Sequence, residues 1–187
     1  MNVPESTRNR ILHAALRIIG EHGIAGLTNR LVAKEAGLSL GSLTYHFTSQ
    51  SELLREALLV FVTEETRRIT AIADSLAPTV GSVEEAAAAA ERAVTEMALG
   101  PEEIGVYELY LQSARDPELH EAVRACFAEY DRAATGALEL LVIPGAAELA
   151  PHVVALVMGA QLRRVATGAA PTPIAAGLLR LVGSPSA

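Results

Sequence analysis

Hydrophobic residues recur at intervals of three and four positions along almost the whole of this 187-residue chain. That spacing is typical of amphipathic helices, and no run alternates apolar with polar residues for long enough to predict a strand. Half of the residues are hydrophobic, so a chain of this length can bury a sizeable core. The pattern therefore predicts an all-α fold with an ordered interior.

Glycine, proline and capping residues divide this pattern into nine helices. Serine or threonine at a helix start can accept a backbone hydrogen bond, whereas glycine and proline mark the breaks. The helices are expected at about residues 7–22, 28–36, 39–45, 49–76, 82–99, 101–115, 117–141, 147–167 and 174–182. The eighth could instead begin at Pro151, because proline suits a first helical turn.

Charge is unevenly distributed along the chain. The net charge is -7, with six Lys/Arg against five Asp/Glu in residues 1–56 and nine against seventeen in residues 57–187. Binding to a polyanion depends on local charge, so any contact with nucleic acid is expected in the first third. The same asymmetry also fits ordinary surface variation, so other evidence must decide between the two interpretations.

The cysteine content and the apolar runs indicate a cytoplasmic protein. Cys126 is the single cysteine and cannot form a disulfide within the chain, and the first residues lack the apolar run of a signal peptide. The longest apolar stretches, such as residues 153–160, fall well short of the ~20 residues that a membrane helix needs. No association with a membrane is expected.

No pattern of catalytic or metal-binding residues is visible. The five histidines lack the HExxH spacing or any similar ligand arrangement. The sequence also shows no nucleophile with a base and no paired carboxylates in an apolar setting. We therefore expect no enzyme activity, no metal site and no cofactor.

Residues 28–47 read TNRLVAKEAGLSLGSLTYHF, a spacing that suits two helices packed across a tight turn. Ala33 is small enough for close approach of the helices, and Gly37 can adopt a positive φ. The apolar seam comprises Leu31, Val32, Leu38 and Leu43, which leaves the polar side chains of the second helix outward. Such a helix suits the major groove of DNA, although helical hairpins without DNA contacts use the same turn.

The sequence beyond the turn makes a family resemblance visible. Residues 43–47 are followed at once by the capped amphipathic helix SQSELLREALL, and the stretch from about residue 7 to 60 resembles the TetR family of bacterial repressors. The segment YELYLQSARDPEL at residues 107–119 is also typical of many members. The resemblance implies a nine-helix fold, with a helix-turn-helix DNA-binding domain at residues 1–50 and an effector-binding and dimerisation domain at residues 51–187.

The resemblance also implies a function: a ligand-responsive repressor that binds a palindromic DNA operator as a homodimer and is released by a small-molecule effector. The DNA contacts that it implies fall near the starts of the second, third and fourth helices. They are Thr28, Asn29, Arg30, Ser39, Leu40, Ser42, Thr44, Tyr45, His46 and Gln50.

Two of these positions depart from the family pattern, and two have structural alternatives. The family usually has tyrosine at the position of Thr44 and lysine at that of Gln50, and a glutamine offers a phosphate only a neutral hydrogen bond. We therefore expect this phosphate contact to be weaker and less dependent on salt. Tyr45 could instead pack on the third helix, and His46 could cap it.

For the effector, the resemblance implies a pocket among the fifth to eighth helices. Apolar stripes at residues 104–114 and 119–134 are expected to face a shared interior. A pocket needs a few polar or aromatic groups among its apolar walls, and ordinary core packing is the alternative for each candidate. The candidates are Met97, Tyr107, Tyr110, Gln112, Phe127, Tyr130 and Gln161.

The last two predicted helices are too apolar to face water near a chain terminus. We expect them to pair with their copies in a two-fold homodimer, as the family resemblance also implies. The residues concerned are Val153, Val154, Val157, Gly159, Ala160, Ile174, Ala175, Leu178, Leu179 and Leu181.

A rival function is a helical ligand-binding or partner-binding protein that has lost DNA binding. The acidic balance of residues 57–187 and the glutamine at position 50 favour it. Retardation of DNA in a gel distinguishes the two functions.

Overall fold

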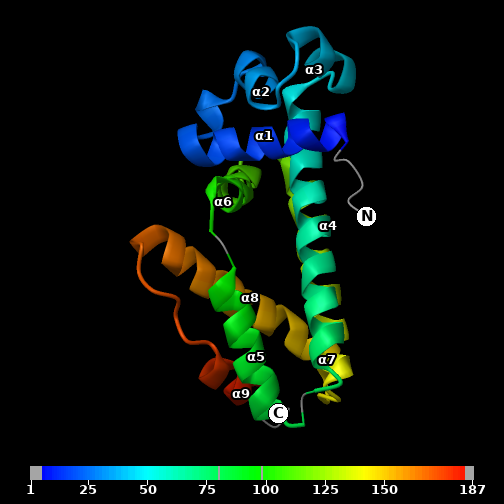
Figure 1. Cartoon of the computed structure of the whole chain (residues 1–187), viewed down its shortest axis with the longest axis vertical. Coiled ribbons are helices and arrows are strands. Elements are labelled where there is room, and N and C mark those ends of the chain that lie inside the picture. The colour runs from blue at the N-terminus through cyan, green and yellow to red at the C-terminus, as the bar shows by residue number, and fades with distance from the viewer. Residues whose placement is uncertain (1–5, 80, 98, 184–187) are drawn as a thin grey trace. The chain divides into compact units, whose positions relative to one another are not determined.

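A computed structural model describes residues 6–79, 81–97 and 99–183 of the chain. Over these residues it contains nine α-helices and no strand, so the predicted fold class and number of helices are confirmed (Figure 1). The helices are α1 (Thr7–His22), α2 (Asn29–Glu35), α3 (Leu40–His46), α4 (Gln50–Leu76), α5 (Val83–Glu96), α6 (Pro101–Ser113), α7 (Pro117–Leu140), α8 (Ala146–Thr167) and α9 (Ala175–Gly183).

The helix starts follow the predicted capping residues. The side chains of Ser6, Thr28, Ser39 and Ser82 each accept a hydrogen bond from a backbone N–H three residues further on. Three details differ from prediction. A short 3₁₀ helix, η1 (Ile24–Gly26), follows α1, α5 ends at Glu96 rather than near residue 99, and Pro151 lies inside α8.

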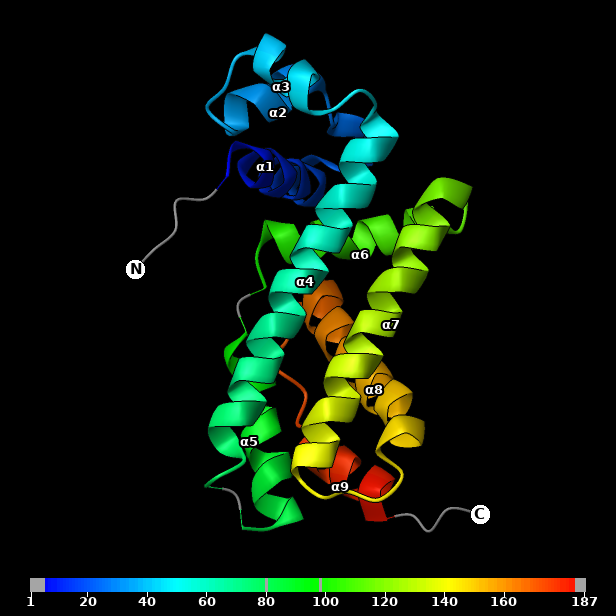
Figure 2. The same cartoon turned by 90° about the vertical axis from the view of Figure 1, so that its right-hand side faces the viewer.

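The described residues form two compact units. The first unit comprises residues 6–63 and 99–126, and the second comprises residues 64–97 and 127–183. In the first unit, α2 and α3 lie on one side of α1, and α6 lies on the other side (Figure 2). The core of this unit is built on α1, whose buried face includes Ile11, Leu12, Leu16 and Ile19, each at most 1% exposed.

Two glycines bring the backbones of α1 and α6 into contact. A Cβ atom added to Gly20 would lie 1.8 Å from the carbonyl oxygen of Pro101. A Cβ added to Gly105 would lie 2.3 Å from the carbonyl oxygen of Leu16. Real Cβ atoms do not approach backbone this closely, so the crossing of the two helices requires glycine at both positions.

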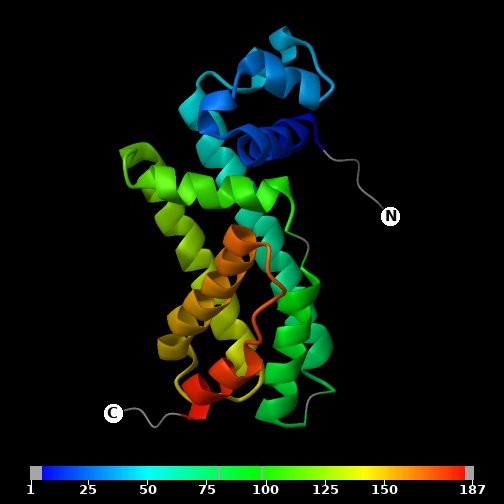
Figure 3. The same ribbon diagram turned by 90° about the vertical axis from the view of Figure 1, so that its left-hand side faces the viewer.

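In the second unit, α9 packs against α5 and α8 (Figure 3). Ala87 of α5 forms a buried cluster with Ile174 and Leu178, and partly buried side chains of α8 surround it. The backbone N–H of Ala175 donates a 2.8 Å hydrogen bond to the carboxylate of Glu91, which ties the start of α9 to α5. No helix among the described residues combines the length and apolar character needed to span a membrane.

Part of the aliphatic surface that the sequence assigned to a partner subunit is core of the chain itself. Val154, Ile174 and Leu178 are at most 9% exposed, because α5, α8 and α9 bury them against one another. The expectation that Leu178 faces a second copy is therefore wrong. The exposed positions of α8 lie on another stripe, which contains Ala155, Gly159, Leu162 and Ala166.

The end of α7 has an unusual residue in the left-handed conformation. Val142 has φ +56° and is 85% exposed. The N–H of Ile143 bonds to Leu138 O at 3.0 Å, and the N–H of Val142 bonds to Glu139 O at 2.9 Å. These are the two hydrogen bonds of a Schellman C-cap, in which the residue at the position of Val142 is usually glycine.

We expect Val142→Gly to raise the free energy of unfolding by about 1 kcal/mol, because a β-branched side chain is strained in the left-handed region. Thermal unfolding should show it as a gain of roughly 2–4 °C for a chain of this size. Val142→Ala is the matched control, since it removes the branching but keeps a Cβ. A glycine variant less stable than the alanine variant would contradict the strain.

Candidate DNA-binding site

The turn between α2 and α3 has the geometry that its sequence predicts. Gly37 has φ +68°, and the N–H of Leu38 bonds to Ala33 O at 2.8 Å while the N–H of Gly37 bonds to Lys34 O at 3.1 Å. This is again a Schellman motif, here with the expected glycine. Ser39 then caps α3, with its Oγ accepting from the N–H of Ser42 at 3.1 Å.

A buried seam fixes which side of α3 faces outward. Val32, Ala33 and Leu43 are at most 3% exposed, whereas Leu31 and Leu38 are partly buried. With Leu43 turned inward, the other residues of α3 form the outer surface of the first unit. α3 therefore presents a short, capped helix of the kind that enters a major groove.

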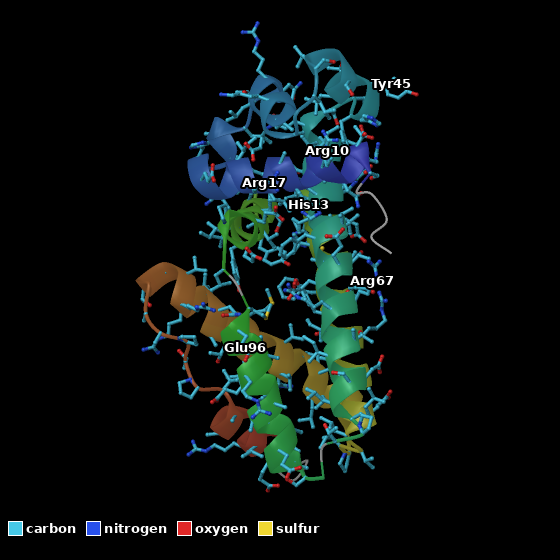
Figure 4. The ribbon with its side chains drawn as sticks, in the orientation of Figure 1. Arg10, His13, Arg17, Tyr45, Arg67 and Glu96 are labelled. Carbon is cyan, nitrogen blue, oxygen red and sulfur yellow. The ribbon has the colours of Figure 1, made fainter. Side chains whose placement is uncertain are left out.

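The ten residues that the family resemblance implied for DNA contact all reach the surface. Ser42 and His46 are half-buried, and the other eight are exposed. Tyr45 is 84% exposed and extends away from the body of α3, while its ring meets that of His46 edge-on at 5.4 Å (Figure 4). The alternative in which Tyr45 packs onto α3 therefore does not describe its position.

The hydroxyl groups at this surface are not equivalent. The oxygens of Thr28 and Ser39 accept capping hydrogen bonds, so each hydroxyl keeps its own hydrogen as a donor for a phosphate oxygen. The hydroxyl of Thr44 already donates within α3, to Leu40 O at 3.3 Å and Gly41 O at 3.1 Å. Thr44 consequently offers its oxygen lone pairs and its methyl group, where the family usually has a phenol.

Arginines of α1 hold the ends of α2 and α3, a role that the sequence did not reveal. Arg8 donates to the backbone oxygen of His46 at 2.8 Å, pairs with Glu56, and lies 4.4 Å from the centroid of the Phe47 ring. Arg10 donates to Ala36 O at 2.6 Å. Both cations sit at helix C-termini, where the helix dipole favours positive charge.

These contacts change which basic residues are available for phosphates. Arg8, Arg10 and Arg17 are engaged within the first unit. The other three basic residues of positions 1–56 are exposed and make no ion pair with any described residue: Arg30, Lys34 and Arg55. The charge that can attract DNA is therefore smaller than the sequence count suggested.

The start of α4 differs from the predicted capping box. Ser49 Oγ accepts from the N–H of Glu52 at 3.1 Å as expected, but the Glu52 carboxylate accepts from the N–H and hydroxyl of Thr48 at 2.9 and 2.8 Å. These hydrogen bonds hold the pKa of Glu52 below its ordinary value. Gln50 is exposed beside this carboxylate, so a phosphate here would meet a neutral donor and a nearby negative charge.

An ion network joins α6, α1 and α2 within the first unit. Glu102 of α6 lies 2.8 Å from His13 Nδ1 and 2.6 Å from Arg17 Nη1, and Arg17 Nε donates to Glu35 at 3.0 Å (Figure 4). Burial would raise the pKa of Glu102, but the hydrogen bonds and charges of His13 and Arg17 outweigh it and hold the pKa low. Glu108 adds a bond from the N–H of Ile24 at 3.0 Å.

The candidate ligand residues of α6 lie in the first unit. Tyr107, Tyr110 and Gln112 are half-buried, and the two tyrosine rings meet edge-on at 6.2 Å. Burial raises the pKa of Tyr107 to about 12, so its phenol stays neutral. The predicted apolar stripe on α6 is wrong, since Leu111 is 70% exposed and the buried residues are Gly105, Val106, Leu109 and Ser113.

The remaining candidates lie in the second unit, where two of them meet. Gln161 is 5% exposed, and its Nε2 donates to Val94 O at 3.2 Å and lies 3.7 Å from Met97 Sδ. Arg164 donates to Met97 O at 2.9 Å, so α8 holds the end of α5 at two points. Gln161 and Met97 thus have a structural role. Phe127 is 37% exposed and Tyr130 is half-buried.

The search for a metal site gives the same picture as the sequence. No group of three or more His, Cys, Asp and Glu among the described residues is arranged to hold a metal ion.

Comparison with known proteins matches both parts of the chain to one family. Residues 11–57 match the family model described as bacterial regulatory proteins, tetR family, and residues 81–184 match the tetracyclin repressor-like C-terminal domain. The HTH-type transcriptional regulator PksA of Bacillus subtilis (strain 168) is 45% identical over 69 residues. That match covers 37% of this chain and only 34% of PksA.

Solved structures extend the similarity to nearly the whole chain. A TetR family member from Streptomyces coelicolor A3 is 31% identical, with TM-score 0.71, and the match covers 96% of this chain and 100% of that one. The multidrug binding protein EbrR complexed with ethidium is 30% identical, with TM-score 0.71 and the same coverage. These relatives are regulators or binding proteins, not enzymes. The chain therefore belongs to the TetR family of transcriptional regulators.

Proposed function

We propose that this regulator is a homodimeric repressor that binds a palindromic operator through α3 and is released by a small-molecule effector. In this proposal residues 1–50 bind DNA, and residues 51–187 bind the effector and the partner subunit. The observation that carries it is the outward face of α3, where Tyr45 is 84% exposed beside a capped helix N-terminus. Ten surface positions match those that contact DNA in the family.

Gel retardation of the DNA upstream of the gene tests operator binding. We expect a specific complex whose affinity falls with salt, though with a shallow slope, because few basic residues remain to contact phosphates. If no DNA is retained at low salt, the rival function, a helical ligand-binding or partner-binding protein, is favoured.

Similarity to EbrR supports a small-molecule effector. EbrR has been solved with ethidium, malachite green and proflavin. We propose that this chain also takes a compact organic effector, and that the bound effector weakens operator binding. Reciprocity then requires operator DNA to weaken effector binding by the same factor, so titrations with and without operator test the coupling. Equal effector affinity in the two titrations would refute it.

The exposed stripe of α8 supports a two-fold dimer. Gly159 has nothing within 4 Å of an added Cβ, and Leu162 on the same stripe is 48% exposed. Small residues allow the helix of a second copy to approach closely, which suits a four-helix interface built from two copies of α8 and α9.

Gly159→Asp should therefore convert the dimer to a monomer at micromolar concentration, because it would bury an unpaired charge in the interface. Sedimentation measures the change, and circular dichroism should show that helix content is retained. Ala125→Asp, on an exposed position of α7, is the control and should remain dimeric. A dimeric Gly159→Asp protein would place the interface elsewhere.

A further inference from the structure

The buried face of α4 changes from apolar to polar at Glu65. Leu58 and Val62 are at most 1% exposed, and Glu65 and Thr66 continue the same face at 8% and 5% exposure. Residues three and four apart lie on one side of a helix, so these four side chains form one continuous stripe. A carboxylate in such a stripe is unusual, because a buried charge is costly unless it is fully paired.

Only one of the two Glu65 oxygens has a partner. Oε2 pairs with Arg68, one turn further along α4, whose side chain is 53% exposed. Oε1 is buried, and no donor among the described residues forms a hydrogen bond with it. A buried acceptor left without a donor costs about 1–3 kcal/mol, and more when it carries charge. The fold thus holds one negatively charged acceptor at the expense of its own stability.

We propose that Glu65 is the counter-charge for a cationic effector, and that the effector is an organic cation with an apolar body. The positive charge would lie against Oε1, and the apolar body would meet the aliphatic part of the α4 face near Val62. This inference rests on the proposed effector-binding function and adds to it the charge of the ligand and the residue that selects it. Ethidium and malachite green, which EbrR binds, are organic cations of this kind.

The test uses the full-length protein without DNA and two fluorescent probes of opposite charge. Ethidium is the cation, and 8-anilinonaphthalene-1-sulfonate is the anion with an apolar body. We expect Glu65→Gln to weaken ethidium binding about 10- to 100-fold, which is the range for a lost charge-assisted contact. Affinity for the sulfonate probe should stay the same or rise.

A matched control separates the local contact from the net charge of the helix. Asp74 is an exposed carboxylate on the same helix, and Asp74→Asn removes the same charge. This variant should bind both probes as the parent protein does. Glu65→Gln should also melt at the same temperature as the parent or higher, because a buried neutral amide is less costly than a buried carboxylate.

Each contrary result has a distinct meaning. Unchanged ethidium affinity in Glu65→Gln, or an equal loss for both probes, would overturn the role of Glu65. Binding of the sulfonate but not of ethidium by the parent protein would overturn the cationic class and leave effector binding intact. If neither probe binds, the inference falls together with the proposed effector function, whereas operator binding is measured independently by gel retardation.

Discussion

Gly105→Ala should lower the free energy of unfolding by about 3 kcal/mol, the upper end of the range for overpacked cores. The new Cβ would lie 2.3 Å from Leu16 O and 3.1 Å from Leu16 C. These are backbone atoms, so no change of side-chain rotamer can relieve the clash, and α1 and α6 must separate. Gly20→Ala should have an effect at least as large, since its Cβ would lie 1.8 Å from Pro101 O.

Gly136→Ala is the control for this prediction. Gly136 lies inside α7, and nothing lies within 4 Å of an added Cβ. Alanine is favoured over glycine in a helix interior by roughly 0.5–1 kcal/mol, so this variant should be slightly more stable than the parent. Urea denaturation of all three variants at one protein concentration gives the comparison. Gly105→Ala as stable as Gly136→Ala would show that the two backbones do not touch.

The contact between α1 and α6 also has a consequence for DNA recognition. Arg8 and Arg10 of α1 hold the C-termini of α3 and α2, and Glu102 of α6 holds α1 through His13 and Arg17. A displacement of α6 against α1 would therefore reach α3 through a chain of direct contacts. The sequence suggested α4 as the connection between the two domains, and the first unit contains this second route.

Local features of the fold could be predicted because they depend on residues three to five positions apart. Ser39 and Ser82 cap the expected helices, and Gly37 has the positive φ that the turn between α2 and α3 requires. The same rules failed at Val142, which occupies a glycine position without being a glycine. A Schellman motif can form around a strained residue when the flanking hydrophobic contacts, here Leu138 with Ile143, stabilise it.

Long-range contacts could not be predicted, since periodicity does not say which helix a face meets. Gly105 looked like an ordinary helical glycine, and only its approach to Leu16 explains it. Arg8 and Arg10 looked like phosphate ligands, but their partners are backbone oxygens 38 and 26 positions away. Leu178 is as apolar as an interface residue, yet α5 covers it within the same chain.

At the candidate DNA-binding site, Arg30→Ala and Tyr45→Ala should each weaken operator binding about 10-fold to more than 100-fold. A good contact to a base or phosphate is worth about 1–3 kcal/mol, and a two-fold dimer loses it twice. Both side chains are exposed and make no hydrogen bond or ion pair with another described residue, so helix content and dimerisation should not change. Gel retardation at fixed salt measures the loss.

The pattern of the loss identifies what each side chain contacts. If Arg30 binds only phosphate, Arg30→Ala should weaken all operator sequences equally and make the salt dependence shallower by about one counterion per half-site. If it reads guanine, discrimination at one base pair of each half-site should fall as well. Tyr45→Phe separates the ring from the hydroxyl, because only a hydroxyl contact is lost with it. Arg92→Ala, an exposed cation of α5, is the control for charge and should bind normally. Full affinity in both Arg30→Ala and Tyr45→Ala would remove α3 and the start of α2 as the DNA-binding surface.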